Sequence, residues 1–536
     1  MNHSARKSGK AARDDNIKAL SAIFNILKST LGPRGLDKML INEVGDIEVS
    51  NDGAFILKSL RLVHPIAQTI QQTAEQQDSA VGDGTTSATL VACELVKVAG
   101  RLQEQGLHPS FIIKGYRMAS ELAVAFVNEQ LAVNTTDLGP AALSNVARTT
   151  LSSKIIGASQ ALFCNIVVNA IESVKIASDF FGTTYPIRNI GIVKIHGKSL
   201  TESELVNGYC LPCGKAADQM PSYVDDAKIA FLDFALMKAR LKIGIQVLVS
   251  DADKLEGIRQ REINILKERV EMILASGANV ILTTGGIDEI AMKYFVESGS
   301  IAVRRVAKPD LRRLAKATGG SIITTLADEI GNESFDSVQL GTCDEVVCRK
   351  LGDKDVMFFK GTKHATSASI VLRGPNEQTL DEAQRSIHDA LCAVRRALTS
   401  DRVVAGGGSV ESALHVYLEN EANKISGREQ LAVLAFAEAL LTIPKTLASN
   451  AALDATELTA QLVAYQAEAQ KEGAKKEVRY AGLDLDNDTV TNNLSRGVLE
   501  PALAKTKYLE YATEAAITVL RVDTTVTLPA REEAQK

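Results

Sequence analysis

Residues 82–96 read GDGTTSATLVACELV, a turn bounded by glycines and followed by an apolar run at helical spacing. Glycine lets a backbone approach a ligand closely, and Thr or Ser at a helix start offers N–H groups and hydroxyls where the dipole favours an anion. The segment can therefore bind phosphate, and the carboxylate of Asp83 can bind Mg²⁺. A turn closed by an ordinary helix N-cap explains the same residues equally well.

Three further glycine turns lie elsewhere in the chain. Residues 31–39 (LGPRGLDKM) end a predicted helix, where Gly32 could admit a phosphate or a base to the backbone. Residues 50–54 (SNDGA) separate a strand-like run from a helix-like run, and by themselves they are better explained as a hairpin or turn. In residues 403–411 (VVAGGGSVE) three glycines precede an apolar helix, which indicates either close packing on the backbone or a flexible loop.

Helical periodicity dominates roughly the first and last 140 residues, whereas the middle alternates short β-rich runs with helices, so three regions are predicted. Two strands are expected in the middle, one of them at Val280–Thr283 and the other at Ile243, Ile245, Val247 and Val249. The charged helix between them should project partly into solvent and bury Leu266, Val270, Ile273 and Leu274.

A later helix is predicted after the turn at Gly374 and Pro375. Its apolar stripe consists of Leu380, Ala383, Ile387, Leu391 and Val394. Asp389 lies off that stripe, and a solvated aspartate is the simplest explanation from spacing alone.

The chain of 536 residues is long enough for about two to four domains. Its net charge of -5, with both signs interspersed, provides no broad basic face for nucleic acid or anionic lipid. No uncharged apolar run of about 18 residues and no secretory h-region is apparent, so we expect neither nucleic acid nor membrane as a partner and a cytoplasmic location. The seven cysteines should be reduced, and the Cys210–Cys213 spacing is better explained by buried thiols than by a metal or redox site.

Four motifs together resemble the chaperonin family and occur in that family's order: LGPRGLDKML, SNDGAFILK, GDGTTSATLVACEL and VVAGGGSVE. The resemblance covers nearly the whole chain. HDAL around Asp389 and the polar insertion after Val249 are similar to the group II branch, while LSSKIIG, KIHGKSLTES and residues 228–251 and 281–320 are similar to the alpha branch of the eukaryotic cytosolic ring.

The resemblance implies an α/β multidomain chaperonin fold. A mostly helical equatorial domain, a small intermediate domain and an α/β apical domain with a helical protrusion, the built-in lid, are expected. The implied boundaries are 1–143 and 401–536 for the equatorial domain, 144–209 and 368–400 for the intermediate domain, and 210–367 for the apical domain, with the lid near 250–275.

The resemblance also implies a site for ATP or ADP with Mg²⁺. Asp83 would hold the metal, Asp52 would assist at the metal and the attacking water, and Asp389 would activate that water. Hydrolysis needs charge neutralisation at the phosphates and a carboxylate within reach of water, so these roles are chemically reasonable. The other implied binders are Gly84, Thr85, Thr86 and Ser87 at the phosphates, Lys154 at the terminal phosphate, Gly32 lining the nucleotide, Gly406, Gly407 and Gly408 at the adenosine, and Glu500 at the ribose.

Two departures from the family pattern put parts of this site in doubt. Phe55 stands where Thr is common and could alter packing beside Asp52, and the segment DLDNDTVTNN weakens the case for contacts from Asp484.

The implied function is ATP-dependent folding of proteins such as actin and tubulin by a hetero-oligomeric double ring of paralogous subunits. A scaffold subunit with weak or absent hydrolysis is the alternative, and an unrelated α/β enzyme with a glycine-rich site is a further one.

Overall fold

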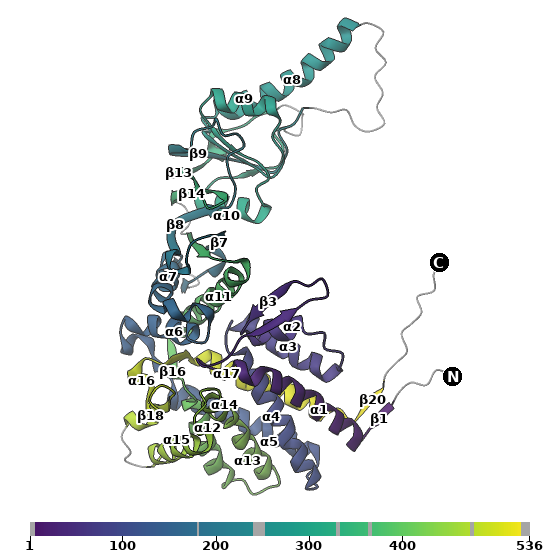
Figure 1. Ribbon diagram of the computed structural model, residues 1–536, viewed down its shortest axis with the longest axis vertical. Coiled ribbons are helices and arrows are strands. Elements are labelled where there is room, and N and C mark those ends of the chain that lie inside the picture. The colour runs from purple at the N-terminus through teal and green to yellow at the C-terminus, as the bar shows by residue number, and fades with distance from the viewer. Residues whose placement is uncertain are drawn as a thin grey trace, which may run out of the picture. The chain divides into compact units, whose positions relative to one another are not determined.

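The computed structural model describes residues 6–178, 182–238, 252–327, 333–362, 367–471 and 476–526 (Figure 1). Two units are distinct within it. Unit 1 combines residues 1–168 with 381–536, and unit 2 consists of residues 169–380. Both ends of the chain therefore contribute to one unit, while the boundaries of an intermediate domain stay a prediction.

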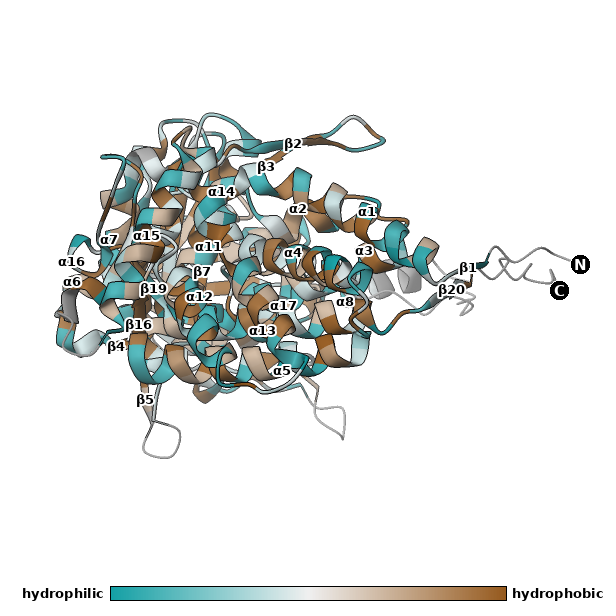
Figure 2. Cartoon of the chain, turned by 90° about the horizontal axis from the view of Figure 1, so that it is seen from below, coloured by the Kyte–Doolittle hydropathy of each residue, from teal (hydrophilic) through white to brown (hydrophobic). Residues whose placement is uncertain are grey.

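Unit 1 is a helical bundle around α4 (Thr85–Glu104), which packs against α1, α3, α13 and α17. Most α4 residues are buried, and most of the buried ones are Ala, Val or Leu, as its apolar run predicts. Brown apolar and teal polar segments alternate along the helices in Figure 2, as expected for helices that bury one face. The other helices of the unit are α1 Lys10–Leu27, α2 Gly53–Ser59, α3 Pro65–Ala80, α5 Pro109–Phe126, α6 Ala141–Leu151, α12 Ser409–Ala422, α13 Glu429–Leu440, α14 Thr442–Asn450, α15 Ala455–Ala469, α16 Asn493–Arg496 and α17 Ala502–Leu520.

Short strands fasten distant parts of unit 1 together. β1 (Arg6–Ser8) pairs antiparallel with β20 (Thr524–Val526), so an early and a late segment of the chain lie side by side. The other strands form a β2–β3 hairpin, a β19–β16–β4 sheet and a β17–β18 pair. Their bounds are β2 Lys38–Ile41, β3 Ile47–Ser50, β4 Val133–Asn134, β16 Arg402–Ala405, β17 Ala481–Asp484, β18 Thr489–Asn492 and β19 Leu499–Pro501.

Unit 2 contains a nine-stranded mixed sheet in the order β11-β10-β9-β13-β14-β8-β15-β7, with β12 also paired to β9. Pairing is parallel among β9 to β12 and between β15 and β7, and it is antiparallel from β9 through β13 and β14 to β8 and β15. The strands are β7 Ile190–His196, β8 Glu204–Leu211, β9 Tyr223–Leu232, β10 Val280–Thr283, β11 Ile301–Val303, β12 Ile322–Ile323, β13 Gly341–Leu351, β14 Lys354–Thr362 and β15 Ala368–Gly374. A separate hairpin pairs β5 (Ile176–Ser178) with β6 (Gly182–Thr184).

Helices cover both faces of this sheet. Ile229 and Phe231 of β9 face α10 (Lys308–Thr318), and the alternating residues Ala230 and Leu232 face α8 (Ala252–Ala275) and α9 (Glu289–Glu297). The predicted strand at 280–283 and the buried positions Leu266, Val270 and Ile273 of α8 are confirmed, whereas Leu274 is only partly buried. Figure 1 shows the start of α8 extending beyond α9, but the strand predicted at 243–249 lies outside the described residues.

Two helices cross the boundary between the units, α7 (Gln160–Ser173) and α11 (Glu377–Ser400). The predicted stripe of α11 is confirmed, because Leu380, Ala383, Ile387, Leu391 and Val394 are all buried. Asp389 is buried too, so the interpretation of a solvated side chain is wrong.

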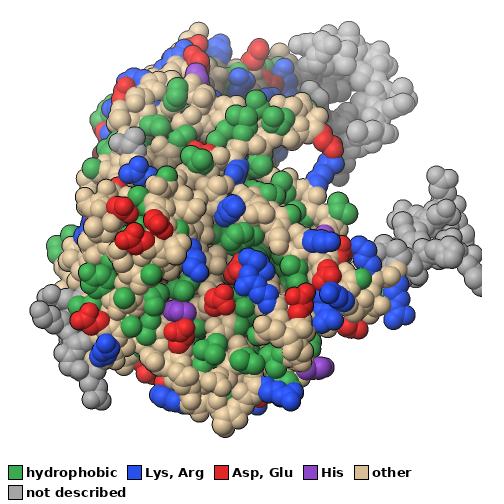
Figure 3. Space-filling model, turned by 60° about the horizontal axis from the view of Figure 1, so that its bottom comes forward, with side chains coloured by type: hydrophobic (Ala, Val, Ile, Leu, Met, Phe, Trp, Pro, Cys, Tyr) green, Lys and Arg blue, Asp and Glu red, His purple; other side chains and the backbone are tan. Residues whose placement is uncertain are grey.

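One stretch passes a test of length and apolar character for a membrane-spanning helix. It is Glu429–Asn450, and 67% of its most apolar window is buried inside the structure, as in a core helix. Its apolar run is interrupted by Glu438 and Lys445. On the face shown in Figure 3, basic and acidic side chains are interspersed.

Candidate functional site

A cavity of about 470 Å³ lies within unit 1 and is lined by segments from distant parts of the chain. Its size is ordinary for a small-molecule site, which spans about 300–1,000 Å³. The cavity brings together the four glycine-containing motifs, the segment from Arg148 to Lys154, Asp389, and the turn from Asn493 to Glu500.

The start of α4 forms one wall. Gly84 adopts a left-handed conformation with φ of 78°, and no side chain among the described residues caps the helix. An uncapped helix start presents backbone N–H groups and a positive dipole end, which suits phosphate. Gly53 at the start of α2 permits close packing here, because a Cβ on it would lie 2.7 Å from the Thr86 hydroxyl.

Asp52 and Asp83 are oriented by their own turns. Asp52 caps α2 and accepts hydrogen bonds from the amides of Ala54 and Phe55 at 3.1 and 3.2 Å, and from the Thr85 hydroxyl at 3.1 Å. Asp83 accepts from the Gly84 amide at 2.6 Å and from the Thr150 hydroxyl at 3.1 Å. The Asn-Asp-Gly segment is therefore a helix cap rather than a hairpin turn.

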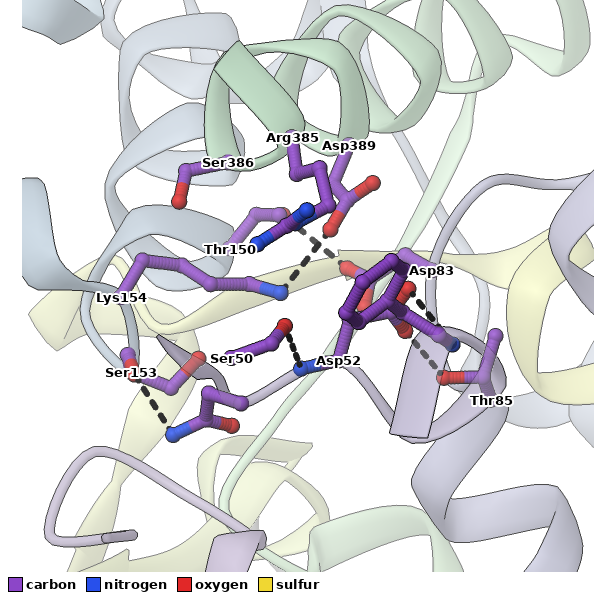
Figure 4. Close-up of polar contacts among 12 residues, drawn as sticks. Ser50, Asp52, Asp83, Thr85, Thr150, Ser153, Lys154, Arg385, Ser386 and Asp389 are labelled. Carbon is purple, nitrogen blue, oxygen red and sulfur yellow. Dashed lines mark hydrogen bonds and ion pairs between the residues drawn. The ribbon is translucent and has the colours of Figure 1, made fainter. Parts of the chain in front are cut away.

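Lys154 and Asp389 form a buried ion pair at 2.9 Å and line the same cavity as these aspartates. Figure 4 shows Lys154, Asp389, Asp52 and Asp83 directed toward one another. Burial, together with the charges of Asp52 and Asp83, raises the pKa of Asp389 well above its ordinary value despite the opposing charge of Lys154. Burial would lower the pKa of Lys154, but the neighbouring carboxylates outweigh it, so the ammonium stays charged.

A second buried charge cluster supports the other end of the cavity. Lys505 lies 2.8 Å from Glu500 and 2.9 Å from Glu411, and the Tyr508 hydroxyl donates to Glu411 at 2.8 Å. Glu411 is fully buried, whereas the Glu500 side chain is 29% exposed and lines the cavity. The positive charge of Lys505 therefore holds the Glu500 carboxylate in place at the cavity wall.

Apolar side chains form the remaining wall, at Leu31, Ile443, Leu447, Leu483 and Leu485. Gly32 has φ of 87°, and a Cβ on it would lie 2.4 Å from Leu447. This part of the cavity is suited to a flat apolar group such as a base.

All but one of the predicted site residues line this cavity. The exception is Gly406, whose carbonyl accepts from the Asn493 amide at 3.0 Å. Asp484 lines the cavity, but its carboxylate is engaged by Arg496 and by the Asn487 amide.

Sequence reasoning missed Arg148, Thr150, Asn493 and Lys505, which also line the cavity. The hydroxyl contact to Asp83 could have been predicted from the Thr149-Thr150 pair, which lies shortly before Lys154 in the sequence. Lys505 lies in a helix that also contains Lys507, Glu510 and Glu514, so nothing in the local sequence distinguished it.

The donor chemistry of Asp52 and Asp83 fits Mg²⁺, which prefers carboxylate oxygens together with phosphate and water. Among the described residues no group of three or more His, Cys, Asp or Glu side chains could hold a metal ion unaided. A metal here would therefore need further ligands from water or a bound phosphate compound. Cys210 is buried in β8, and burial raises the pKa of its thiol to about 12, which disfavours the thiolate that metal binding needs.

The chain is similar to known proteins over nearly its whole length. The model of the TCP-1/cpn60 chaperonin family matches residues 23–529. T-complex protein 1 subunit alpha of Arabidopsis thaliana is 51% identical, over 99% of this chain and 97% of its own length. The protein of the same name from Tetrahymena pyriformis is 50% identical over 98% and 97%, and thermosome subunit alpha of Thermoplasma acidophilum is 39% identical over 97% and 92%.

Proposed function

The chain belongs to the TCP-1/cpn60 chaperonin family, and from this premise we propose that it is an ATP-hydrolysing subunit of a hetero-oligomeric double ring that folds non-native proteins. The relatives named as subunits of T-complex protein 1 and of the thermosome support a ring of paralogous subunits. Actin and tubulin as clients, and the cytoplasm as location, are part of the same proposal.

One observation carries the enzymatic part of the proposal. The buried Lys154–Asp389 pair shares a cavity with Asp52, Asp83 and the uncapped start of α4. A cation, three carboxylates and free helix amides around one cavity suit a ligand that is itself polyanionic and binds a divalent cation. A nucleoside triphosphate has this chemistry, and the apolar wall of the cavity can receive its base.

In the proposed reaction, the oxygen of a water molecule attacks the γ-phosphorus, and the bond to the β,γ-bridging oxygen breaks to release ADP and phosphate. Asp389 accepts the proton of the water, and Lys154 donates hydrogen bonds to the γ-phosphoryl oxygens. Mg²⁺ held by Asp83 and Asp52 would neutralise phosphate charge. The raised pKa of Asp389 supports its role, since a general base works best when its pKa approaches the working pH.

Replacement of Asp389 tests this proposal. Asp389→Asn keeps the shape of the side chain and removes the proton acceptor, so we expect phosphate release from this subunit to fall by about 10²–10⁴-fold while ATP binding persists. Glu377→Gln removes an exposed carboxylate from the same helix and serves as the control, with turnover unchanged. Unchanged turnover in Asp389→Asn would exclude the mechanism, and a wild-type chain that binds but does not hydrolyse ATP would favour the scaffold alternative.

Size measurement tests the ring. In gel filtration the native protein should elute far above the 57.4 kDa of one chain, together with paralogous subunits. An active monomer would instead contradict the proposed ring.

A further inference from the structure

Phe55 and Arg385 form the closest cation–ring contact among the described residues. The guanidinium carbon of Arg385 lies 4.0 Å from the centroid of the Phe55 ring. The other such contacts range from 5.6 to 6.0 Å. Neither residue is among those that line the cavity, so any influence on the ligand must act through other side chains.

Phe55 is attached directly to one of the cavity aspartates. It lies in the first turn of α2, and its amide donates to Oδ2 of Asp52 at 3.2 Å. Oδ1 of the same carboxylate accepts from the Ala54 amide. A displacement of the Phe55 backbone would therefore displace the cap and the Asp52 carboxylate with it.

Arg385 is linked to another cavity aspartate, Asp389, through the helix that carries both residues. It lies one helical turn before Asp389 on α11, so the two residues share one segment of rigid helix. Its Nε donates to Glu382 at 3.0 Å, and a terminal nitrogen donates to the Val49 carbonyl at 3.1 Å. Figure 4 shows Arg385 and Asp389 side by side above Asp52.

We propose that the Phe55–Arg385 contact is a positioning element that sets the distance between Asp52 and Asp389 for hydrolysis. The contact joins the turn that carries one carboxylate to the helix that carries the other. This inference rests on the proposed function, because it concerns the geometry of the same reaction.

The experiment compares Phe55→Leu, Phe55→Tyr and Arg385→Lys in the assembly in which the chain is purified. Asp389→Asn in the same assembly provides the baseline contributed by other subunits. Phosphate release gives kcat and KM for ATP, a non-hydrolysable ATP analogue reports binding, and thermal unfolding reports stability.

We expect Phe55→Leu to lower the kcat above that baseline by roughly three- to tenfold, because the ring face is lost while apolar volume remains. Arg385→Lys should have a similar effect, since an ammonium keeps the charge but not the planar stacking and forked donors. Phe55→Tyr keeps the ring and should retain the wild-type kcat. KM, analogue binding and the unfolding midpoint should stay unchanged in all three variants.

A wild-type kcat in Phe55→Leu would overturn the inference, and so would an equal loss in Phe55→Tyr. A loss of kcat that is matched by weaker analogue binding or a lower unfolding midpoint would show a general packing effect and also overturn it. The two proposals fail differently. If wild-type turnover does not exceed the Asp389→Asn baseline, the proposed hydrolysis fails and the positioning role fails with it, whereas turnover above baseline without sensitivity to Phe55 removes the positioning role alone.

Discussion

Unit 1 and unit 2 differ in how deeply the charged side chains around their cavities are buried. In unit 1, the ion pairs of Lys154 with Asp389 and of Lys505 with Glu411 are buried. Unit 2 has a smaller cavity of about 170 Å³, and the cations that line it on α10 are exposed, namely Arg312, Arg313 and Lys316. When one partner of a buried pair is removed, water cannot solvate the charge that is left. We therefore expect the loss of a charged side chain to lower the free energy of unfolding more in unit 1 than in unit 2.

The largest difference should come from removing a buried cation. Lys505→Met leaves Glu411 buried without its cation, and we expect a loss of about 3–5 kcal/mol in the free energy of unfolding. The control is Lys293→Met in α9, whose pair with Glu297 at 3.7 Å is exposed on both sides and should be worth about 0.3–0.5 kcal/mol. Denaturant unfolding measures both, and similar losses would contradict the contrast between the units.

A smaller difference should appear at two left-handed glycines. Gly82 in unit 1 has φ of 81°, and a Cβ on it would lie 2.4 Å from the Cβ of Cys392. Gly299 in unit 2 has φ of 69° and open space around it. Gly299→Ala should cost about 1–2 kcal/mol from backbone strain, and Gly82→Ala should cost about 1–3 kcal/mol more because α11 must shift.

The same measurement of unfolding free energy tests this pair. Equal costs at the two positions would show that α11 shifts without a free-energy cost to make room for the added methyl group. The close packing of Gly82 against α11 would then not hold the 82–87 turn in place.

The pH dependence of hydrolysis follows from the raised pKa of Asp389. Below that pKa the carboxyl is protonated and cannot accept a proton from water, so kcat should fall about tenfold per pH unit. The decline should begin well above pH 3.8, the ordinary aspartate value. A pH–rate profile measures it, and Asp389→Asn should lack this limb; a decline confined to the ordinary aspartate range would contradict the burial argument.

The smallest effect should come from a polar contact in unit 2. The Tyr209 hydroxyl donates to Asp310 at 2.7 Å, and Tyr209→Phe removes it without changing the ring. Asp310 is partly exposed and stays near Arg313, so the loss should be about 1 kcal/mol with ATP turnover unchanged. Denaturant unfolding and a turnover assay check the two halves of this expectation.

The elements with strong local patterns were predictable from the sequence. Helical spacing is clear in the apolar run after Ser87 and in the stripe on α11, and residues 280–283 form a short apolar run typical of a strand. Each pattern lies within a single element, so it could be recognised without knowing any contact to a distant part of the chain. The glycine turns were predicted to bind a ligand because the four motifs together, in their order along the chain, resembled a known family, and no single motif was decisive.

Contacts between distant residues were not predictable in this way. The packing of Gly82 on Cys392 and the pairing of Lys505 with Glu411 join residues far apart in the chain. Phe55 was noticed as a departure, but its partner Arg385 lies 330 positions later and became visible only once α11 was placed beside α2. Asp389 was misjudged from its spacing for the same reason.

The pairing of β1 with β20 bears on how the protein is synthesised. Residues 169–380 leave the ribosome as one continuous segment and can fold as soon as they emerge, because domains generally fold as units during translation. The bundle around α4 has to wait for α17 and β20, which follow unit 2 in the chain, so its apolar surfaces stay uncovered while unit 2 is made. A premature stop just before Thr524 would remove β20, the partner strand of β1, after unit 2 and the helices of unit 1 had been made.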